Sequence, residues 1–157
     1  MEGHKAWVVA VDMGYGHQRA AYPLRHLSPD GKIWIANNYQ GIPANDRRIW
    51  KNTRLFYELF SRVKKVPIVG DFLFDAFIDS MQKIPPFYPR RDLSKPSFQL
   101  KTMYTAIRAG WGRNLVELMN KEDIPLITTF PDVAFFDEVH GFKNDLYVVV
   151  LDDDITR

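Results

Sequence analysis

The 157-residue sequence contains no cysteine, which excludes a disulfide framework, a thiolate zinc site and a cysteine nucleophile. A reducing compartment fits that composition. Long apolar runs are also missing, since no window of about 18 residues is apolar and uncharged enough to span a membrane. The opening residues, MEGHKAWVVAVD, hold too short an apolar run for a signal peptide. These absences favour a cytoplasmic location.

An excess of one charge is missing as well, because the formal net charge is only +2. Global charge therefore predicts no nucleic-acid partner. The length suits one domain, and 46% hydrophobic with 25% charged residues is typical of a globular protein. The aromatic share of 14% is high, so we expect some rings to line a surface or cleft as well as the core.

The first 37 residues predict a β-α-β unit. Residues 6–11 form a continuous apolar run of the kind found in strands buried on both faces. Residues 17–27 have helical spacing, with Pro23 expected to kink the helix or mark a late start. A second strand over 32–37 completes a right-handed crossover between parallel strands.

The rest of the chain continues the alternation of helices and strands. The patterns predict amphipathic helices over 47–65, 70–84 and 98–120, a strand over 124–130, a short helix over 132–139 and a buried strand over 147–151. Gly110 and Gly112 weaken the middle of the third helix. The best fold class is an α/β doubly wound domain, in which ligands bind beyond the carboxyl ends of the strands. Segments 12–17, 128–132 and 152–154 should converge there.

The two-glycine turn at Gly14 and Gly16 is the first candidate site. Its backbone could approach a phosphate closely, with the N–H groups of the following helix facing the anion. The alternative is a tight turn that needs glycine for its dihedral angles alone. A dinucleotide is disfavoured because Arg19 replaces the third glycine and the second strand ends in Asn37, with no ribose-binding acid. A Walker A loop is excluded, since no Gly-Lys-Ser/Thr follows.

His17 follows this turn, where the positive end of the helix dipole favours a neutral imidazole. A neutral ring can accept a proton from a hydroxyl or donate one hydrogen bond. The alternative is a surface histidine that caps the turn. The other histidines, His4, His26 and His140, have no partner at a metal-binding spacing, so no metal site is predicted.

Three acids, Asp152, Asp153 and Asp154, follow the last predicted strand. They could bind Mg²⁺ or supply a general base. Neighbouring strand residues alternate in direction, so the three cannot all face one site. The alternative is a solvated acidic loop.

The helix over 47–65 is basic and aromatic, with seven Lys or Arg against one acid, Glu58. Such a helix could lie on an anionic membrane surface, which would make the protein peripheral to the membrane. The alternative, which we favour, is an ordinary helix whose apolar face packs on the sheet.

The stretch GYGHQRAA at residues 14–21 resembles the G-x-G-H-x-x-A-A motif of the glycosyltransferases that make monogalactosyldiacylglycerol and diglucosyldiacylglycerol. It is more distantly similar to the Gly-Gly-His turn of the peptidoglycan N-acetylglucosaminyltransferase. The TTFP stretch at 128–131 looks like the S-T-H-P strand end of that family, with Phe130 in place of its histidine. The VLDDD stretch at 150–154 looks like a strand that ends in T-D there.

This resemblance implies one half of a GT-B architecture, with residues 1–157 as the acceptor-side Rossmann-like domain and a helix-rich insertion at about 45–120. A donor-binding domain would follow Arg157 and hold most of the nucleotide sugar, so the isolated chain would be inactive. The acceptor would be a hydroxyl compound, with a lipid among the candidates, and the scheme needs no metal or cofactor. The implied catalytic residues are His17, Asp152 and Asp154, and the implied substrate- or phosphate-binding residues are Gly14, Tyr15, Gly16, Thr129 and Asp132.

Two other functions fit the same sequence. One is a non-catalytic Rossmann-like module that binds a phosphorylated ligand, a nucleotide or a partner protein. The other is half of an enzyme that resembles a sugar-nucleotide epimerase, which shares the two-domain layout.

Overall fold

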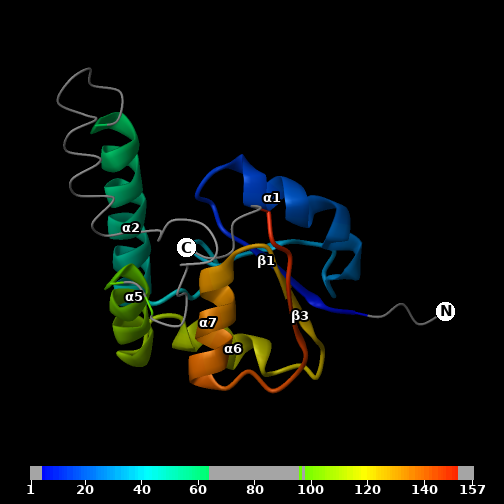
Figure 1. Cartoon of the computed structure of the whole chain (residues 1–157). Helices are drawn as coiled ribbons and strands as arrows, with labels where there is room; N and C mark the ends of the chain where they lie inside the picture. The colour runs from blue at the N-terminus through cyan, green and yellow to red at the C-terminus, as the bar shows by residue number, and fades with distance from the viewer. Residues whose placement is uncertain (1–4, 64–95, 97, 152–157) are drawn as a thin grey trace, which may run out of the picture.

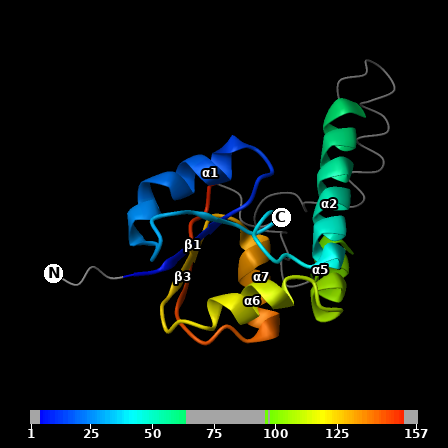
Figure 2. The same cartoon turned by 180° about the vertical axis from the view of Figure 1, so that it is seen from behind.

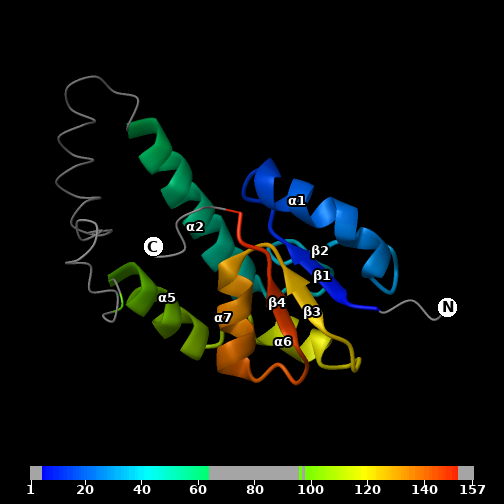
Figure 3. The ribbon, with the colours of Figure 1, turned by 45° about the vertical axis from the view of Figure 1, so that its right-hand side comes forward.

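The computed structural model describes residues 5–63, 96 and 98–151. Its centre is a four-stranded parallel sheet with the strand order β2-β1-β3-β4 (Figure 3). Strand β1 (Trp7–Ala10) pairs with β2 (Trp34–Ile35) on one side and with β3 (Leu126–Thr128) on the other, and β4 (Leu146–Val148) pairs with β3. The predicted α/β class with a parallel sheet is confirmed. The helix predicted over 70–84 lies outside the described residues.

Successive side chains of β1 point to opposite faces of the sheet, and both faces are apolar and covered by helices. Val8 and Ala10 pack with α1 (Tyr15–Ala21) and the 3₁₀ helix η1 (Tyr22–Leu27). Trp7 and Val9 face the larger core, which includes residues of α2 (Ala44–Val63), α5 (Phe98–Arg108), α6 (Arg113–Met119) and α7 (Pro131–His140). Figures 1 and 2 show α1 on the side of the sheet opposite to α6 and α7.

The single helix predicted over 17–27 is wrong in its bounds. Helix α1 begins at Tyr15 and ends at Ala21, and the chain continues as η1 with Pro23 in its first turn. Proline lacks an N–H and its ring clashes with the carbonyl four residues earlier, so the α-helix stops before it. His17 therefore lies inside the first turn of α1.

The helix predicted over 98–120 is also wrong, because it is divided into α5 and α6. Gly110 and Gly112 separate them with φ angles of 115° and 81°. These angles favour glycine over any residue with a Cβ atom. A Cβ on Gly112 would lie 2.3 Å from the ring of Phe136, so this turn also needs glycine for space.

Helix α2 joins the larger core through its N-terminal half. Trp50 is 3% exposed, and its ring lies 4.9 Å from that of Trp111 and 6.0 Å from those of Phe130 and Phe136. Such edge and tilted ring contacts stabilise a packed core. The favoured alternative for this segment is a helix whose apolar face packs on the sheet. Its first turns do pack on the core, but Trp50 contacts Trp111, Phe130 and Phe136, which lie outside the strands. Its C-terminal part extends away from the sheet (Figure 1).

The last strand differs from the prediction of a buried strand over 147–151. Strand β4 is shorter and lies at the sheet edge, where Tyr147 is 55% and Val148 40% exposed. An apolar run has the same sequence pattern at a buried centre and at an uncovered edge. None of the described helices has the length and apolar character that spanning a bilayer requires.

Candidate functional site at the strand ends

The candidate site lies where the strand order reverses. After β1 the chain returns through α1 to β2 on one side, and the later strands β3 and β4 add on the other side. In such sheets the loops after the two central strands diverge and leave room for a ligand. These loops are residues 11–14 after β1 and residues 129–130 after β3, and both carry predicted site residues.

His17 and Thr129 connect the two loops directly. The Nδ1 atom of His17 lies 2.6 Å from the carbonyl oxygen of Thr129. The hydroxyl of Thr129 donates a hydrogen bond of 3.0 Å to the carbonyl oxygen of His17. These two hydrogen bonds fix the position of His17. Thr129 itself is only 1% exposed, so it has almost no surface that a ligand could contact.

The first of these bonds fixes the tautomer of His17. A carbonyl oxygen can only accept, so Nδ1 must carry the hydrogen. In the neutral ring Nε2 is then the atom with the free lone pair, able to accept a proton. Nε2 has no hydrogen-bond partner within the described residues. A bound hydroxyl would therefore find a proton acceptor already oriented at this position.

Phe130 supports the same ring from another direction. Its ring centre lies 4.9 Å from that of His17, with the two planes at 89°. This edge-to-face contact restricts rotation of the imidazole without adding a charge or a hydrogen bond. Phe130 thus orients His17 through packing.

Gly14 and Gly16 have different reasons for being glycine. Gly14 caps α1 with φ 113°, which strains any residue with a side chain. Gly16 has helical dihedrals, and a Cβ there would meet nothing within 4 Å. Neither the dihedral angles nor the available space therefore requires glycine at Gly16. The absence of a side chain leaves the backbone of this residue accessible to solvent. Tyr15 between them is 80% exposed.

Three further predicted positions lie beside this cluster or outside the described residues. Asp132 occupies the first turn of α7. Although part of the residue reaches solvent, desolvation of the carboxyl raises its pKa to about 6. Asp152 and Asp154 lie outside the described residues. We group His17, Thr129, Phe130, Gly14 and Gly16 as the strand-end cluster.

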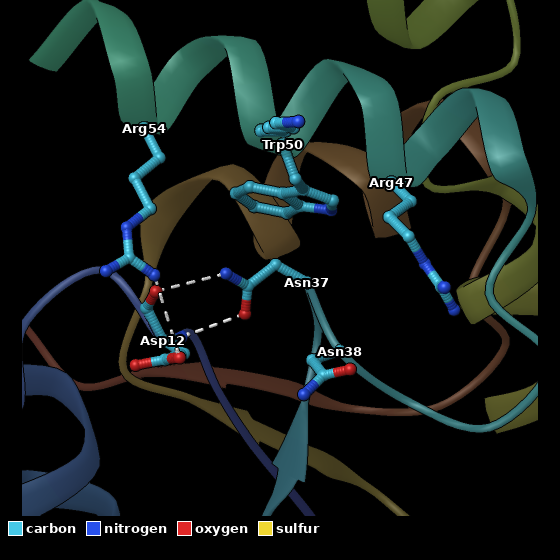
Figure 4. Close-up of a pocket in the computed structure, with 7 residues that line it drawn as sticks. Asp12, Asn37, Asn38, Arg47, Trp50 and Arg54 are labelled. Carbon is cyan, nitrogen blue, oxygen red and sulfur yellow. Dashed lines mark hydrogen bonds and ion pairs between the residues drawn. The ribbon is translucent and has the colours of Figure 1, made fainter.

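A pocket of about 240 Å³ opens next to this cluster, where β1 and β2 end under α2 (Figure 4). Its lining is mostly polar or charged and comprises Asp12, Asn37, Asn38, Arg47, Trp50, Lys51 and Arg54. The sequence prediction missed these residues as a site, although Arg47, Lys51 and Arg54 recur at the spacing of one helix face. The sequence does not show that this face of α2 is directed toward the ends of β1 and β2.

Asp12 organises the floor of the pocket. Its backbone N–H donates to Oδ1 of Asn37 at 2.9 Å, and Nδ2 of Asn37 donates to its carbonyl oxygen at 3.2 Å. Its carboxylate accepts a hydrogen bond of 3.0 Å from Gln18 and lies 3.9 Å from the guanidinium of Arg54. Since Gln18 adjoins His17 in α1, this hydrogen bond links the pocket to the helix that carries His17.

A second polar group lies inside the larger core, and we call it the interior cluster. Asp46 accepts a 3.1 Å hydrogen bond from the backbone N–H of Gly112. Nε2 of His140 lies 2.9 Å from the carbonyl oxygen of Trp111, so it donates to that oxygen. Asp137 is 3% exposed, and neither of its carboxyl oxygens has a hydrogen-bond partner among the residues that the structure describes.

Burial governs the titration of the interior carboxyls. Desolvation raises the pKa of Asp137 to about 7 and also raises the pKa of Asp46, where the Gly112 N–H and His140 partly oppose it. Neither cluster holds a metal site, as no three His, Asp or Glu side chains gather suitably in the described part of the chain.

Comparisons of the chain with models of protein families, with curated proteins and with solved structures gave no significant match.

Proposed function

We propose that the chain is the acceptor-side domain of a GT-B-like glycosyltransferase. The observation that carries this proposal is the hydrogen bond between His17 Nδ1 and the Thr129 carbonyl. It leaves Nε2 as the proton acceptor, beside a bare glycine backbone at the reversal of the strand order. The G-x-G-H-x-x-A-A resemblance supports the same function from the sequence.

In the proposed reaction His17 Nε2 takes the proton of an acceptor hydroxyl as its oxygen attacks the anomeric carbon of the donor sugar. The bond from that carbon to the nucleoside diphosphate breaks, and the diphosphate leaves with the electron pair. Proton transfer of this kind contributes about 10²–10⁴-fold to a rate. Thr129 and Phe130 act as positioning residues for the imidazole.

The remaining parts of the scheme follow from the resemblance. The Gly14–Gly16 loop faces the leaving diphosphate, with Tyr15 and Asp132 beside the substrates, and Asp152 or Asp154 serves as an additional base. A donor domain after Arg157 binds the nucleotide sugar. Under this proposal the chain is one half of a two-domain enzyme, and α2 brings it to an anionic membrane when the acceptor is a lipid.

A non-catalytic module that binds a phosphorylated ligand is the second candidate. The observation that favours it is the pocket beneath α2, in which Arg47 and Lys51 have no acidic partner within the described residues. The two candidates differ in the need for His17, because binding alone does not use a proton acceptor.

The decisive experiment compares His17→Ala with His26→Ala in a nucleotide-sugar transfer assay on the chain joined to its donor domain. His26 is a matched control, since its Nδ1 also faces a carbonyl oxygen, that of Pro23, at 2.8 Å. We expect His17→Ala to lower kcat by about 10²-fold or more and His26→Ala to leave it unchanged. Equal rates in the two variants would contradict the role of His17.

The tautomer has its own test in long-range ¹H–¹⁵N NMR of the histidine rings. We expect a protonated Nδ1 and an unprotonated Nε2 for His17 in the neutral ring. The opposite tautomer would remove the proposed base whatever the transfer assay shows.

A further inference from the structure

The pocket beneath α2 carries two kinds of recognition group at its two ends. Figure 4 shows Arg47 at one end and Asp12 with Arg54 at the other, with Trp50 along the roof. Lys51 follows Arg47 by one helical turn, so both cations belong to the same face of α2. A single ligand in this pocket would meet two cations at one end and the Asp12–Arg54 ion pair with asparagine amides at the other.

The cationic end suits a phosphate group. Arg47 and Lys51 are exposed, and neither forms an ion pair within the described part of the chain. A guanidinium presents several N–H donors in a planar fork that matches phosphate oxygens, and an ammonium adds a point charge.

The other end suits hydroxyl groups. The carboxylate of Asp12 accepts one hydrogen bond from Gln18, and a carboxylate has about four acceptor positions in all. The amides of Asn37 and Asn38 add both donors and acceptors. Asp12 is 55% exposed and offsets the charge of Arg54, so this end attracts a phosphate less than the end with Arg47 and Lys51 does.

The size of the pocket limits the ligand further. A volume of about 240 Å³ lies below the range of about 300–1,000 Å³ that is typical for drug-sized ligands. Trp50 is 3% exposed and has its ring against other aromatic residues, so little of its surface is left for a nucleobase to stack on. These features favour a compact ligand without a base.

We propose that this pocket binds a polyol phosphate, with the phosphate on Arg47 and Lys51 and the hydroxyls on Asp12 and the two asparagines. The ligand can be a free sugar or polyol phosphate, or the headgroup of a polyol phospholipid. The proposal rests on the proposed glycosyltransferase function only for the fate of the ligand, which is then the acceptor whose hydroxyl faces His17.

Binding is measured by calorimetry on the full chain with myo-inositol 1-phosphate, inositol and inorganic phosphate. Vesicles of phosphatidylcholine containing phosphatidylinositol, and matched vesicles containing phosphatidylserine, form the lipid arm. We expect inositol phosphate to bind at least about tenfold more tightly than inorganic phosphate, because both ends of the pocket then contact the ligand. For a lipid ligand, phosphatidylinositol vesicles should bind at least about tenfold more tightly than phosphatidylserine vesicles for the same reason.

The variants compare two adjacent arginines of α2. Arg47→Gln removes a pocket cation, while Arg48→Gln removes an exposed cation that does not line the pocket. We expect about tenfold weaker binding for Arg47→Gln and no change for Arg48→Gln. Asp12→Asn should reduce the preference for inositol phosphate over inorganic phosphate. Melting temperatures identify any variant that fails to fold, in which case Lys51→Gln replaces Arg47→Gln.

Binding of the soluble compound supports a free ligand, and binding of phosphatidylinositol vesicles alone supports a lipid headgroup. Absence of binding in both arms, equal binding of phosphatidylserine vesicles, or equal losses in Arg47→Gln and Arg48→Gln would overturn the proposal. Binding is measured without a donor sugar, so a failure here is separable from an unchanged rate in His17→Ala.

Discussion

The strand-end cluster and the interior cluster use polar side chains in opposite ways. At the strand ends, His17 is fixed by Thr129 and keeps one ring nitrogen without a partner in the described residues. In the interior, the carboxylate of Asp46 accepts a hydrogen bond from the Gly112 N–H, and Asp137 is buried with no partner for either oxygen in the described part of the chain.

The two clusters therefore affect different properties: the strand-end cluster can bind a ligand, and the interior cluster determines the stability of the fold. A half-buried group with a free lone pair can serve a ligand at little cost, since water solvates it until the ligand arrives. A fully buried carboxyl has no such access and instead penalises the folded state whenever it ionises. Substitutions in the interior should therefore change stability, and substitutions at the strand ends should change binding or catalysis.

The largest effect is expected from Asp137. Its pKa is about 7 in the folded protein against 3.8 as the ordinary value, so the folded state holds a proton that the unfolded state releases. The free energy of unfolding should fall as pH rises from 4 to 7, by up to about 4 kcal/mol. Asp132 adds a smaller change of the same sign.

Urea denaturation at a series of pH values measures this dependence. Asp137→Asn should remove most of the slope, while Asp123→Asn at an exposed position should preserve it. An unchanged slope in Asp137→Asn would mean that another group carries the pH dependence.

Gly112→Ala should be the next most harmful change, at about 3 kcal/mol, because it combines backbone strain with overpacking. Its Cβ would meet the Phe136 ring at 2.3 Å. Gly110→Ala is the matched control, since it has a positive φ of 115° but nothing within 4 Å. Chemical denaturation should rank Gly112→Ala well above Gly110→Ala, and equal losses would exclude the contact with Phe136 as the cause.

Asp46→Ala should lower the free energy of unfolding by about 2 kcal/mol, because it leaves the buried N–H of Gly112 without an acceptor. Asp46→Asn keeps an oxygen and should lose less than half as much. Hydrogen exchange at the Gly112 amide should accelerate in the alanine variant, and protected exchange there would show that this bond contributes nothing.

The smallest effects on stability are expected at the strand ends. Gly14→Ala should lower the free energy of unfolding by about 1 kcal/mol because of its positive φ.

Gly16→Ala should stabilise the chain by about 0.5–1 kcal/mol, since alanine favours a helix and nothing obstructs its Cβ. If the loop binds a phosphate, Gly16→Ala should nevertheless weaken that binding. A loss of stability in Gly16→Ala would contradict the distinction between the two glycines.

The sequence predicted the order of strands and helices well where the pattern is local. The apolar run at 6–11 and the Gly14–Gly16 turn gave β1 and the start of α1 within a few residues. The breaks at Pro23 and at Gly110 with Gly112 were visible as weak points, but local composition does not decide between a kink and a full stop. Burial of β4 failed because an edge depends on partners elsewhere in the chain.

The site was predicted in part, for a similar reason. His17 and the glycines stand together in the sequence and could be found from it. The hydrogen bond to Thr129 joins residues 112 positions apart, and the pocket depends on the rotation of α2 about its axis. Such relations arise only from tertiary packing, so nothing in the sequence showed that Arg47 and Lys51 line a pocket.

The central place of β1 has a consequence for synthesis of the chain. The indole N–H of Trp7 in β1 donates to the carbonyl of Met119, and His17 contacts Thr129, in both cases across 112 residues. At translation rates of about 5–20 residues per second, the first partner of each pair waits about 6–22 s for the second. During that interval β1 has, among the described elements that flank it, α1 and β2 but not yet β3, so one edge of a fully buried strand stays open to other chains or to a chaperone.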